Sequence, residues 1–353
     1  MLNKFVAKIV IFFFPICCSS VFINFFRTSH FINLLMLPLV LLVMWVFILP
    51  KPEISNTENA FPLFLYAIQS LRNYREIQIG ISLVIIVTQA FFLTSVINRH
   101  SVLREVSNLP ALMYVVLMSC FPEQLSFNPL LFANFFIIIF LNKLFNLYQA
   151  ESAVFPTFDA GLFIGIAALF YWPAMFLLPL IWAALILIRP FDLKEWLVSF
   201  IGVGLPFLVF GTVLYWFDML SILSIQTVLE PFYRVQFSAV YNETYIILFV
   251  ILFFIVSASL IKFFRDIRTF AKLRTRKFLI LLVWFFIFAT LSYLISVKKT
   301  MISLSFLAVP LSVLFSNYFI SLKNQILAEL LFILLLAAVI YNQVLFFLQF
   351  NPL

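Results

Sequence analysis

Long, uninterrupted runs of apolar residues dominate the sequence, and they limit the folds that the chain can adopt. Several runs reach about 20 residues, the length that a helix needs to cross the hydrocarbon core of a bilayer. Backbone polar groups in that core must be satisfied internally, which leaves helices or a closed barrel. Because the runs do not alternate with period two, they exclude a barrel and predict an all-α, polytopic transmembrane bundle.

Composition excludes a soluble globular protein. Apolar residues make up 65% of the chain and charged residues 10%. Ordinary soluble domains have roughly 45–50% apolar and about 25% charged residues. A soluble globule of this length could not bury so much Leu, Ile and Phe, whereas a bilayer offers that surface a matching solvent.

The apolar runs predict about 11 spans, with a range of about 10–12, by the length criterion for a transmembrane helix. The run from Ala160 to Ile188 also fits one helix that is broken at Pro173, because proline removes a backbone donor. The predicted spans are Phe31–Leu49, Ile77–Ile97, Asn108–Phe121, Pro129–Tyr148, Ala160–Trp172, Ala174–Ile188, Trp196–Phe217, Tyr245–Ile261, Phe278–Ser296, Met301–Leu322 and Gln325–Leu348.

Basic residues gather in one short segment between two spans, opposed only by Asp266. Short basic loops mark the cytoplasmic side of a membrane protein, so this segment orients the chain with its N-terminus inside and its C-terminus outside. Such residues also attract anionic lipid headgroups. The candidate headgroup-binding residues are Lys262, Arg265, Arg268, Lys272, Arg274, Arg276 and Lys277.

This pattern divides the chain into four parts. Residues 1–26 form an apolar extension that resembles the start of a signal peptide but has no clear cleavage site. Residues 27–261 form the membrane core, residues 262–277 the basic cytoplasmic loop, and residues 278–353 the C-terminal transmembrane helices. We expect residues 1–20 to be dispensable.

Several function classes lack the residues that they need. The sequence has 6 glycines and no phosphate-binding loop or dinucleotide fingerprint, so we expect no nucleotide cofactor. His30 and His100 are far apart, without a cysteine or carboxylate cluster, so we expect no metal site. A short basic segment between two spans is better explained by membrane orientation than by nucleic-acid binding.

The outer loop from Pro50 to Glu76 holds the residues best suited to chemistry. Glu53 and Glu58 follow the first span, and a carboxylate can act as the general base for an acceptor hydroxyl. Arg72 and Arg75 close the loop, and arginine can hold a phosphate through two parallel hydrogen bonds. Between them, Phe61–Leu71 predicts a helix along the membrane surface. The alternative is a solvated loop anchored at the headgroups.

Polar and small residues within the spans predict helix packing. Gly161 and Gly165 have the spacing that lets two helices approach closely, and we favour internal packing over dimerisation. The side-chain amides of four residues within the predicted spans can form hydrogen bonds between helices. These residues are Gln89, Asn134, Asn317 and Asn342.

Particular motifs resemble an uncharacterised polytopic membrane protein family of Bacteroidota. The resemblance covers roughly residues 25–217 and implies a bacterial inner-membrane, multi-pass protein of the cell envelope. The motifs that carry it are Phe26-Arg27-Thr28-Ser29-His30-Phe31-Ile32-Asn33, Phe158-Asp159-Ala160-Gly161, Ala168-Leu169-Phe170-Tyr171-Trp172-Pro173, and Arg189-Pro190-Phe191 followed by Lys194-Glu195-Trp196.

The layout of the first span, the outer loop and the stretch Asp159–Leu169 also resembles the GT-C class of membrane glycosyltransferases. That resemblance implies a polyprenyl-phosphate-linked substrate, with Glu53 or Glu58 as the base. The loop departs from the class because it contains no Asp. The alternatives are a non-enzymatic lipid flippase or transporter, or a structural subunit with a membrane protein partner. Membrane lipids are the expected partners in every case.

Overall fold

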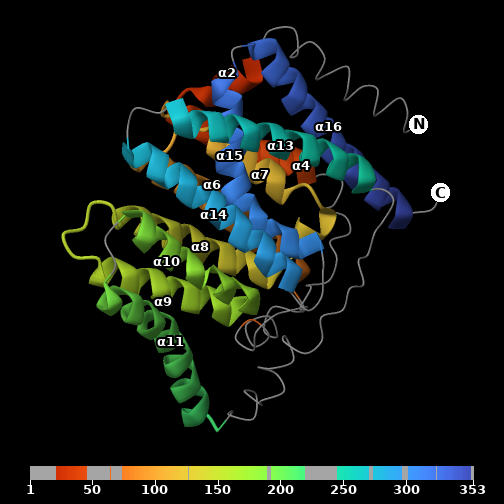
Figure 1. The fold of residues 1–353 in the computed structure, drawn as a ribbon. Coiled ribbons are helices and arrows are strands. Elements are labelled where there is room, and N and C mark those ends of the chain that lie inside the picture. The colour runs from red at the N-terminus through yellow and green to blue at the C-terminus, as the bar shows by residue number, and fades with distance from the viewer. Residues whose placement is uncertain are drawn as a thin grey trace.

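The computed structural model describes residues 21–45, 64, 74–125, 127–188, 192–218, 245–269, 273–295, 301–322 and 324–350 of the chain. Helices of different lengths pack side by side into one bundle in this part of the chain (Figure 1). The all-helical fold predicted from the sequence is therefore confirmed.

The first third of the bundle contains long and short helices. Pro110 lies in the first turn of α7, where its missing N–H is not needed. The Asn128 side chain accepts a hydrogen bond of 3.1 Å from the backbone N–H of Leu131 and so caps α8. The elements are α2 (Val21–Arg27), α3 (Phe31–Leu35), α4 (Leu37–Trp45), α6 (Arg75–Arg99), α7 (Leu109–Met118), the 3-10 turn η1 (Pro122–Leu125) and α8 (Pro129–Asn146).

The middle third contains the predicted break at Pro173. Helix α9 ends before Tyr171, whose backbone is extended, and a 3-10 turn that contains Pro173 follows. The Ser292 hydroxyl of a later helix donates a hydrogen bond of 2.7 Å to the Pro173 carbonyl. The elements are α9 (Val154–Phe170), η2 (Trp172–Leu177), α10 (Leu178–Ile188) and α11 (Leu193–Trp216).

Glycines bring α9 and α11 into backbone contact. A Cβ atom on Gly161 would lie 2.5 Å from the Ser199 carbonyl oxygen, and one on Gly202 would lie 2.5 Å from that of Phe158. Gly165 faces Val203 one turn further along, so the two helices run in the same direction. The prediction that Gly161 and Gly165 serve internal packing is confirmed.

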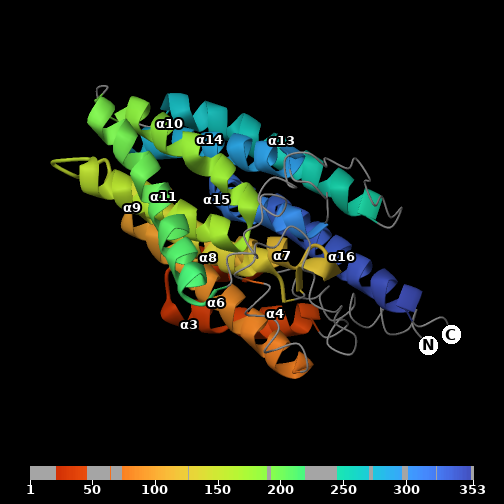
Figure 2. The ribbon, with the colours of Figure 1, turned by 90° about the horizontal axis from the view of Figure 1, so that it is seen from below.

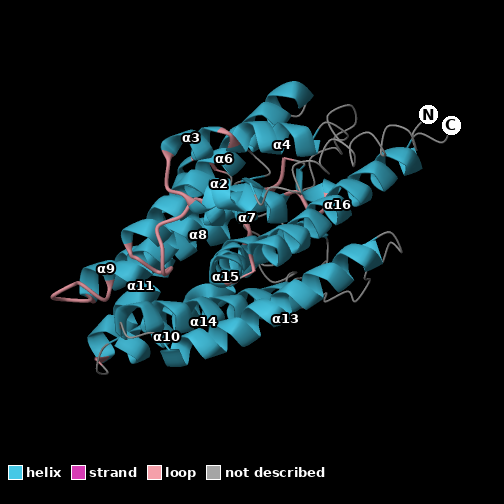
Figure 3. Ribbon diagram, turned by 90° about the horizontal axis from the view of Figure 1, so that it is seen from above, coloured by secondary structure: helices cyan, strands magenta, loops and turns pink. Residues whose placement is uncertain are grey.

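The C-terminal third completes the core rather than forming a separate unit. Figures 2 and 3 show α10, α13 and α14 on one side, α3, α4 and α6 on the other, and α7, α8 and α15 between them. The remaining elements are α13 (Ile246–Thr269), α14 (Leu273–Ile295), the 3-10 turn η5 (Met301–Leu307), α15 (Ala308–Ser321) and α16 (Gln325–Phe350).

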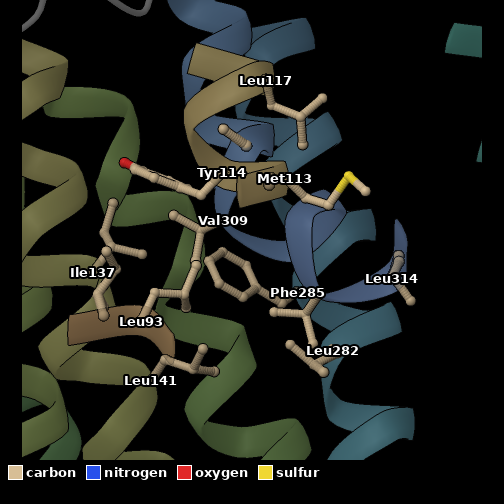
Figure 4. Packing of buried hydrophobic residues seen from close by; sticks show 14 of the residues in the cluster. Leu93, Met113, Tyr114, Leu117, Ile137, Leu141, Leu282, Phe285, Val309 and Leu314 are labelled. Carbon is tan, nitrogen blue, oxygen red and sulfur yellow. The ribbon is translucent and has the colours of Figure 1, made fainter. Parts of the chain in front are cut away.

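The centre of the bundle is a continuous apolar core. Side chains from α6, α7, α8, α14 and α15 interdigitate there (Figure 4). Five of the buried residues in this view are Leu93, Met113, Ile137, Phe285 and Val309.

In the described residues, seven helices are long and apolar enough to cross a membrane, so the count of about 11 spans is not confirmed. These candidate spans are Glu76–Arg99, Pro129–Asn146, Leu193–Trp216, Ile246–Arg268, Leu273–Leu294, Met301–Ser321 and Gln325–Phe347. The other four predicted spans correspond to the shorter apolar helices Ile32–Trp45, Leu109–Met118, Val154–Phe170 and Trp172–Ile188.

Helix α7 shows that an apolar run need not be a membrane span. It has 10 residues, and all of them are buried in the protein. At a rise of 1.5 Å per residue it is about 15 Å long, half of a hydrocarbon core of about 30 Å. An apolar segment can thus be buried against protein instead of crossing lipid.

The large exposed side chains of the long helices, such as Leu208, Phe253 and Phe254, fit a lipid-facing surface. The chain is a multi-pass membrane protein by these features.

Candidate functional site

The predicted basic segment folds as the ends of two helices rather than as a loop. Only residues 270–272, between α13 and α14, lie outside the described part of this hairpin. Lys and Arg have high helix propensity, and the buried Phe263 among them packs into the bundle, so α13 continues through the charges. Lys272 lies outside the described residues. The described cations are Lys262, Arg265 and Arg268 on α13 and Arg274, Arg276 and Lys277 on α14.

Cations from other elements lie at the same end of the bundle. Lys143 near the end of α8 forms an ion pair of 2.7 Å with Asp159, near the start of α9. Since α11 runs parallel to α9, its first turn also lies there. We call this part of the molecule the basic end. Besides the hairpin, its cations are Arg27, Arg99, Arg104, Lys143 and Lys194.

Asp266 is the centre of the basic end and is almost completely buried. Its carboxylate forms ion pairs of 2.8 Å with Arg104 and 3.2 Å with Lys262. The same carboxylate accepts hydrogen bonds from Asn317 at 3.1 Å and from Ser321 at 3.4 Å. One acid thereby ties α13 to α15 and to the turn after α6, and its single negative charge is shared between two cations.

Arg274 forms a second cluster at the basic end. Its guanidinium lies 5.8 Å from the centre of the Tyr148 ring and 5.4 Å from that of Phe278, both within the range of cation–π attraction. The guanidinium also donates to Nδ1 of His100 at 3.3 Å. The ammonium group of Lys277 also lies 5.8 Å from the centre of the Tyr148 ring, which both cations therefore share. Aromatic rings thus hold two cations of α14 in fixed positions.

His100 is buried directly after α6, outside the spanning helix. Burial lowers the pKa of this imidazole below its ordinary value of 6.5, and the positive charges of Arg274 and Arg99 lower it further. A hydrogen bond of 2.9 Å to the Asn142 side chain opposes this shift. His100 is therefore a neutral link between α6, α8 and α14 near neutral pH.

Sequence reasoning identified the cations but not their partners. Asp266 was visible only as the single acid within the basic segment, and its spacing of four residues from Lys262 is the signal that could have revealed the pair. Arg104 and His100 gave no such signal, because Asp266 and Arg274, the charged residues that they contact, lie more than 160 residues away in the chain. Only folding brings them together.

The predicted outer-loop site is not covered in the same way. Glu53, Glu58 and Arg72 lie outside the described residues, and Arg75 is the first residue of α6, with its side chain outside them too. Within the loop the structure describes Phe64, which is buried. Its ring lies 5.6 Å from that of Phe127 and 5.9 Å from that of Phe132, close to the start of α8.

Comparisons with known proteins place the chain in a family. No curated protein and no solved structure matches it significantly. The model of one protein family, described as a family of unknown function (DUF6427), matches residues 59–349. Arg72, Arg75 and the cations of the basic end other than Arg27 lie within this match, whereas Arg27, Glu53 and Glu58 precede it. Because the match covers most of the sequence, the chain belongs to the DUF6427 family.

Proposed function

We propose that this chain is a multi-pass protein of a bacterial inner membrane whose basic end lies at the cytoplasmic face and binds the phosphate headgroups of anionic lipids. The observation that carries the proposal is the one-sided distribution of cations. The lysines and arginines whose side chains the structure describes belong to the helix ends and turns of the basic end. Positive charge of this kind marks the cytoplasmic side.

The basic end has more cations than acids, so positive charge remains that can attract lipid phosphates. The acids Asp266, Glu105 and Asp159 already form ion pairs with cations of the protein. Arg268 and Arg276 are exposed on either side of the hairpin. A guanidinium binds phosphate through paired hydrogen bonds, and each basic residue near an anionic surface adds about 1 kcal/mol of attraction.

Lipid binding by the purified protein tests this proposal. We expect the double variant Arg268→Gln, Arg276→Gln to bind phosphatidylglycerol in nanodiscs more weakly than wild type, by about 30-fold at low salt if each residue adds about 1 kcal/mol. The matched comparison is Arg99→Gln, Lys194→Gln, which removes the same charge from exposed positions of the basic end that are not part of the hairpin, and a smaller loss is expected there. Equal losses in both double variants, or no loss in either, would overturn a headgroup site on the hairpin.

Cysteine labelling tests the orientation. Leu273 at the start of α14 and Phe217 after α11 are both exposed and lie at opposite ends of the bundle. In a variant without the native cysteines, Leu273→Cys should react with an impermeant maleimide only after the cells are permeabilised. Phe217→Cys should react in intact cells. The opposite pattern would invert the proposed orientation and place the basic end outside.

A second candidate function is an envelope glycosyltransferase that uses a polyprenyl-phosphate-linked sugar at the opposite end. It is favoured by Phe64, a residue of the predicted outer loop, because its ring packs against those of Phe127 and Phe132 at the start of α8. Glu53 or Glu58 would take the proton of an acceptor hydroxyl while Arg72 or Arg75 holds the leaving phosphate.

The test of this second candidate is replacement of each carboxylate by its amide. Glu53→Gln or Glu58→Gln should abolish transfer to an acceptor without changing protein abundance, since a substitution in a solvated loop, as the sequence predicts here, costs within about 0.5 kcal/mol. Wild-type behaviour of both variants in cells would leave a lipid flippase or a structural subunit of a membrane complex as the function of this end.

A further inference from the structure

Helix α7 ends inside the bundle, at the side opposite to the basic end. It begins beside the basic end, where the Asn108 side chain donates to the His30 carbonyl at 2.9 Å. After its 10 buried residues the chain turns through Ser119 and Cys120 into η1. The last carbonyls of a helix have no partner within the helix, and they carry the negative end of its dipole.

Two buried amide side chains contact this helix end, and a third lies in the turn that follows it. From α16, Gln343 donates to the Ser119 carbonyl at 2.9 Å and Asn342 donates to that of Cys120 at 3.5 Å. From η1, Gln124 donates to the Met301 carbonyl at 3.2 Å. Helix α16 packs directly against η1, so the three side chains belong to one region. We call Gln124, Asn342 and Gln343 the amide site.

Each of these amides donates a hydrogen bond through its N–H group, but its side-chain oxygen has no donor among the described residues. The side-chain oxygens of Gln124, Asn342 and Gln343 are buried and accept no hydrogen bond from the described part of the chain. An unsatisfied buried acceptor costs about 1–3 kcal/mol. Gln89 shows that the bundle can satisfy both ends of a buried amide: it donates to the Leu131 carbonyl and accepts from the Tyr114 hydroxyl at 2.8 Å.

We propose that the amide site binds one alkali-metal cation through these three oxygens, with the Ser119 and Cys120 carbonyls as further ligands. All the uncompensated atoms are acceptors, and a single water has only two hydrogens to offer them. The end of a short buried helix adds negative potential, and such ends coordinate Na⁺ in transporters.

The chemistry of the site selects the kind of ion. In the described residues, no group of three His, Cys, Asp or Glu side chains could hold a metal ion, which argues against a transition metal. Neutral amide and carbonyl oxygens suit a monovalent ion, because sites for divalent ions rely on carboxylates. One acid lies nearby: Glu123, next to Gln124, accepts a hydrogen bond of 3.0 Å from Tyr245.

Thermal unfolding of the full-length protein in detergent tests the site independently of lipid binding. The Tm is measured in sodium, potassium and choline chloride at one ionic strength. A cation that binds only the folded state raises the Tm in a saturable way. We expect sodium or potassium to raise the Tm above its value in choline, and the ion with the larger shift is the preferred ligand. Identical Tm values of wild type in the three salts would overturn the proposal.

Variants assign the effect to these residues. Gln343→Met removes one ligand at similar size and should abolish the difference between alkali-metal salts and choline. The matched control Gln89→Met also removes a buried amide, and it should lower the Tm in every salt but keep that difference. Asn342→Asp adds a negative ligand and should enlarge it. A salt difference that persists in Gln343→Met and is unchanged in Asn342→Asp would place the ion elsewhere.

Discussion

The two ends of the bundle solve the same problem with different side chains. Both must satisfy polar groups next to an apolar core, at places where helices stop. The basic end uses charge: Asp266 pairs with Arg104 and Lys262, and rings hold Arg274. The amide site uses neutral groups, Asn342 and Gln343, which donate to the carbonyls at the end of α7.

Access to water explains the difference. The side chains of Arg104 and Lys262 are 42% and 30% exposed, although the Asp266 carboxylate between them is 1% exposed. Their charged groups therefore keep contact with water or headgroups while their stems are buried. Gln343 is fully buried, and a full charge at such a depth is costly. The comparison teaches that depth decides whether an ion pair or an amide finishes a helix here.

The largest expected effect comes from breaking the basic end at Asp266. Asp266→Asn leaves Arg104 and Lys262 without their buried counter-charge. Loss of one partner of a fully buried pair costs about 3–5 kcal/mol, and the partial exposure of both cations brings our expectation down to about 2–3 kcal/mol. Thermal unfolding in detergent measures the loss as a fall in Tm.

The Arg27–Glu105 pair, which is more exposed, provides the control for this prediction. Glu105→Gln should cost no more than about 1 kcal/mol. If it lowers the Tm as much as Asp266→Asn, the basic end is a set of equivalent surface charges and has no buried centre.

An intermediate effect is expected between the two ends, where no charge is involved. Gly202→Ala places a Cβ atom 2.5 Å from the Phe158 carbonyl oxygen and forces α9 and α11 apart, at a cost of about 1–3 kcal/mol. Gly204→Ala, on the same helix, meets nothing within 4 Å and should stabilise α11 by up to about 1 kcal/mol. Equal Tm shifts would show that the two helices do not pack through Gly202.

The smallest effect is the pH dependence contributed by His100. Its folded pKa is below the unfolded value of 6.5, so the unfolded state binds more protons once the pH falls below that value. Stability is thus complete above pH 6.5 and declines as the pH falls. His100→Gln should flatten the decline of Tm. Asn142→Leu removes the hydrogen bond that opposes the shift and should steepen it. An unchanged slope in both variants would contradict this role of His100.

Sequence patterns predicted local features of this fold well. Apolar runs located the helices, the spacing of Gly161 and Gly165 predicted close packing, and the interhelical hydrogen bonds of Gln89 and Asn317 were expected. The predicted number of about 11 spans is not confirmed, because hydropathy cannot distinguish burial in lipid from burial in protein, as α7 shows. The partners of Asp266 and the orphaned oxygen of Gln343 depend on contacts between distant segments.

The burial of α7 also has a consequence for biosynthesis. This helix is made early, but α15, which covers it, and α16, which caps its end, are the last two helices described. A segment of 10 residues is too short to be held across a bilayer by itself. Nearly 200 further residues must therefore be synthesised after α7 before α15 and α16, its neighbours in the folded protein, leave the ribosome. Ribosome stalling before Ala308 should thus leave an assembly intermediate that membrane quality-control proteases recognise.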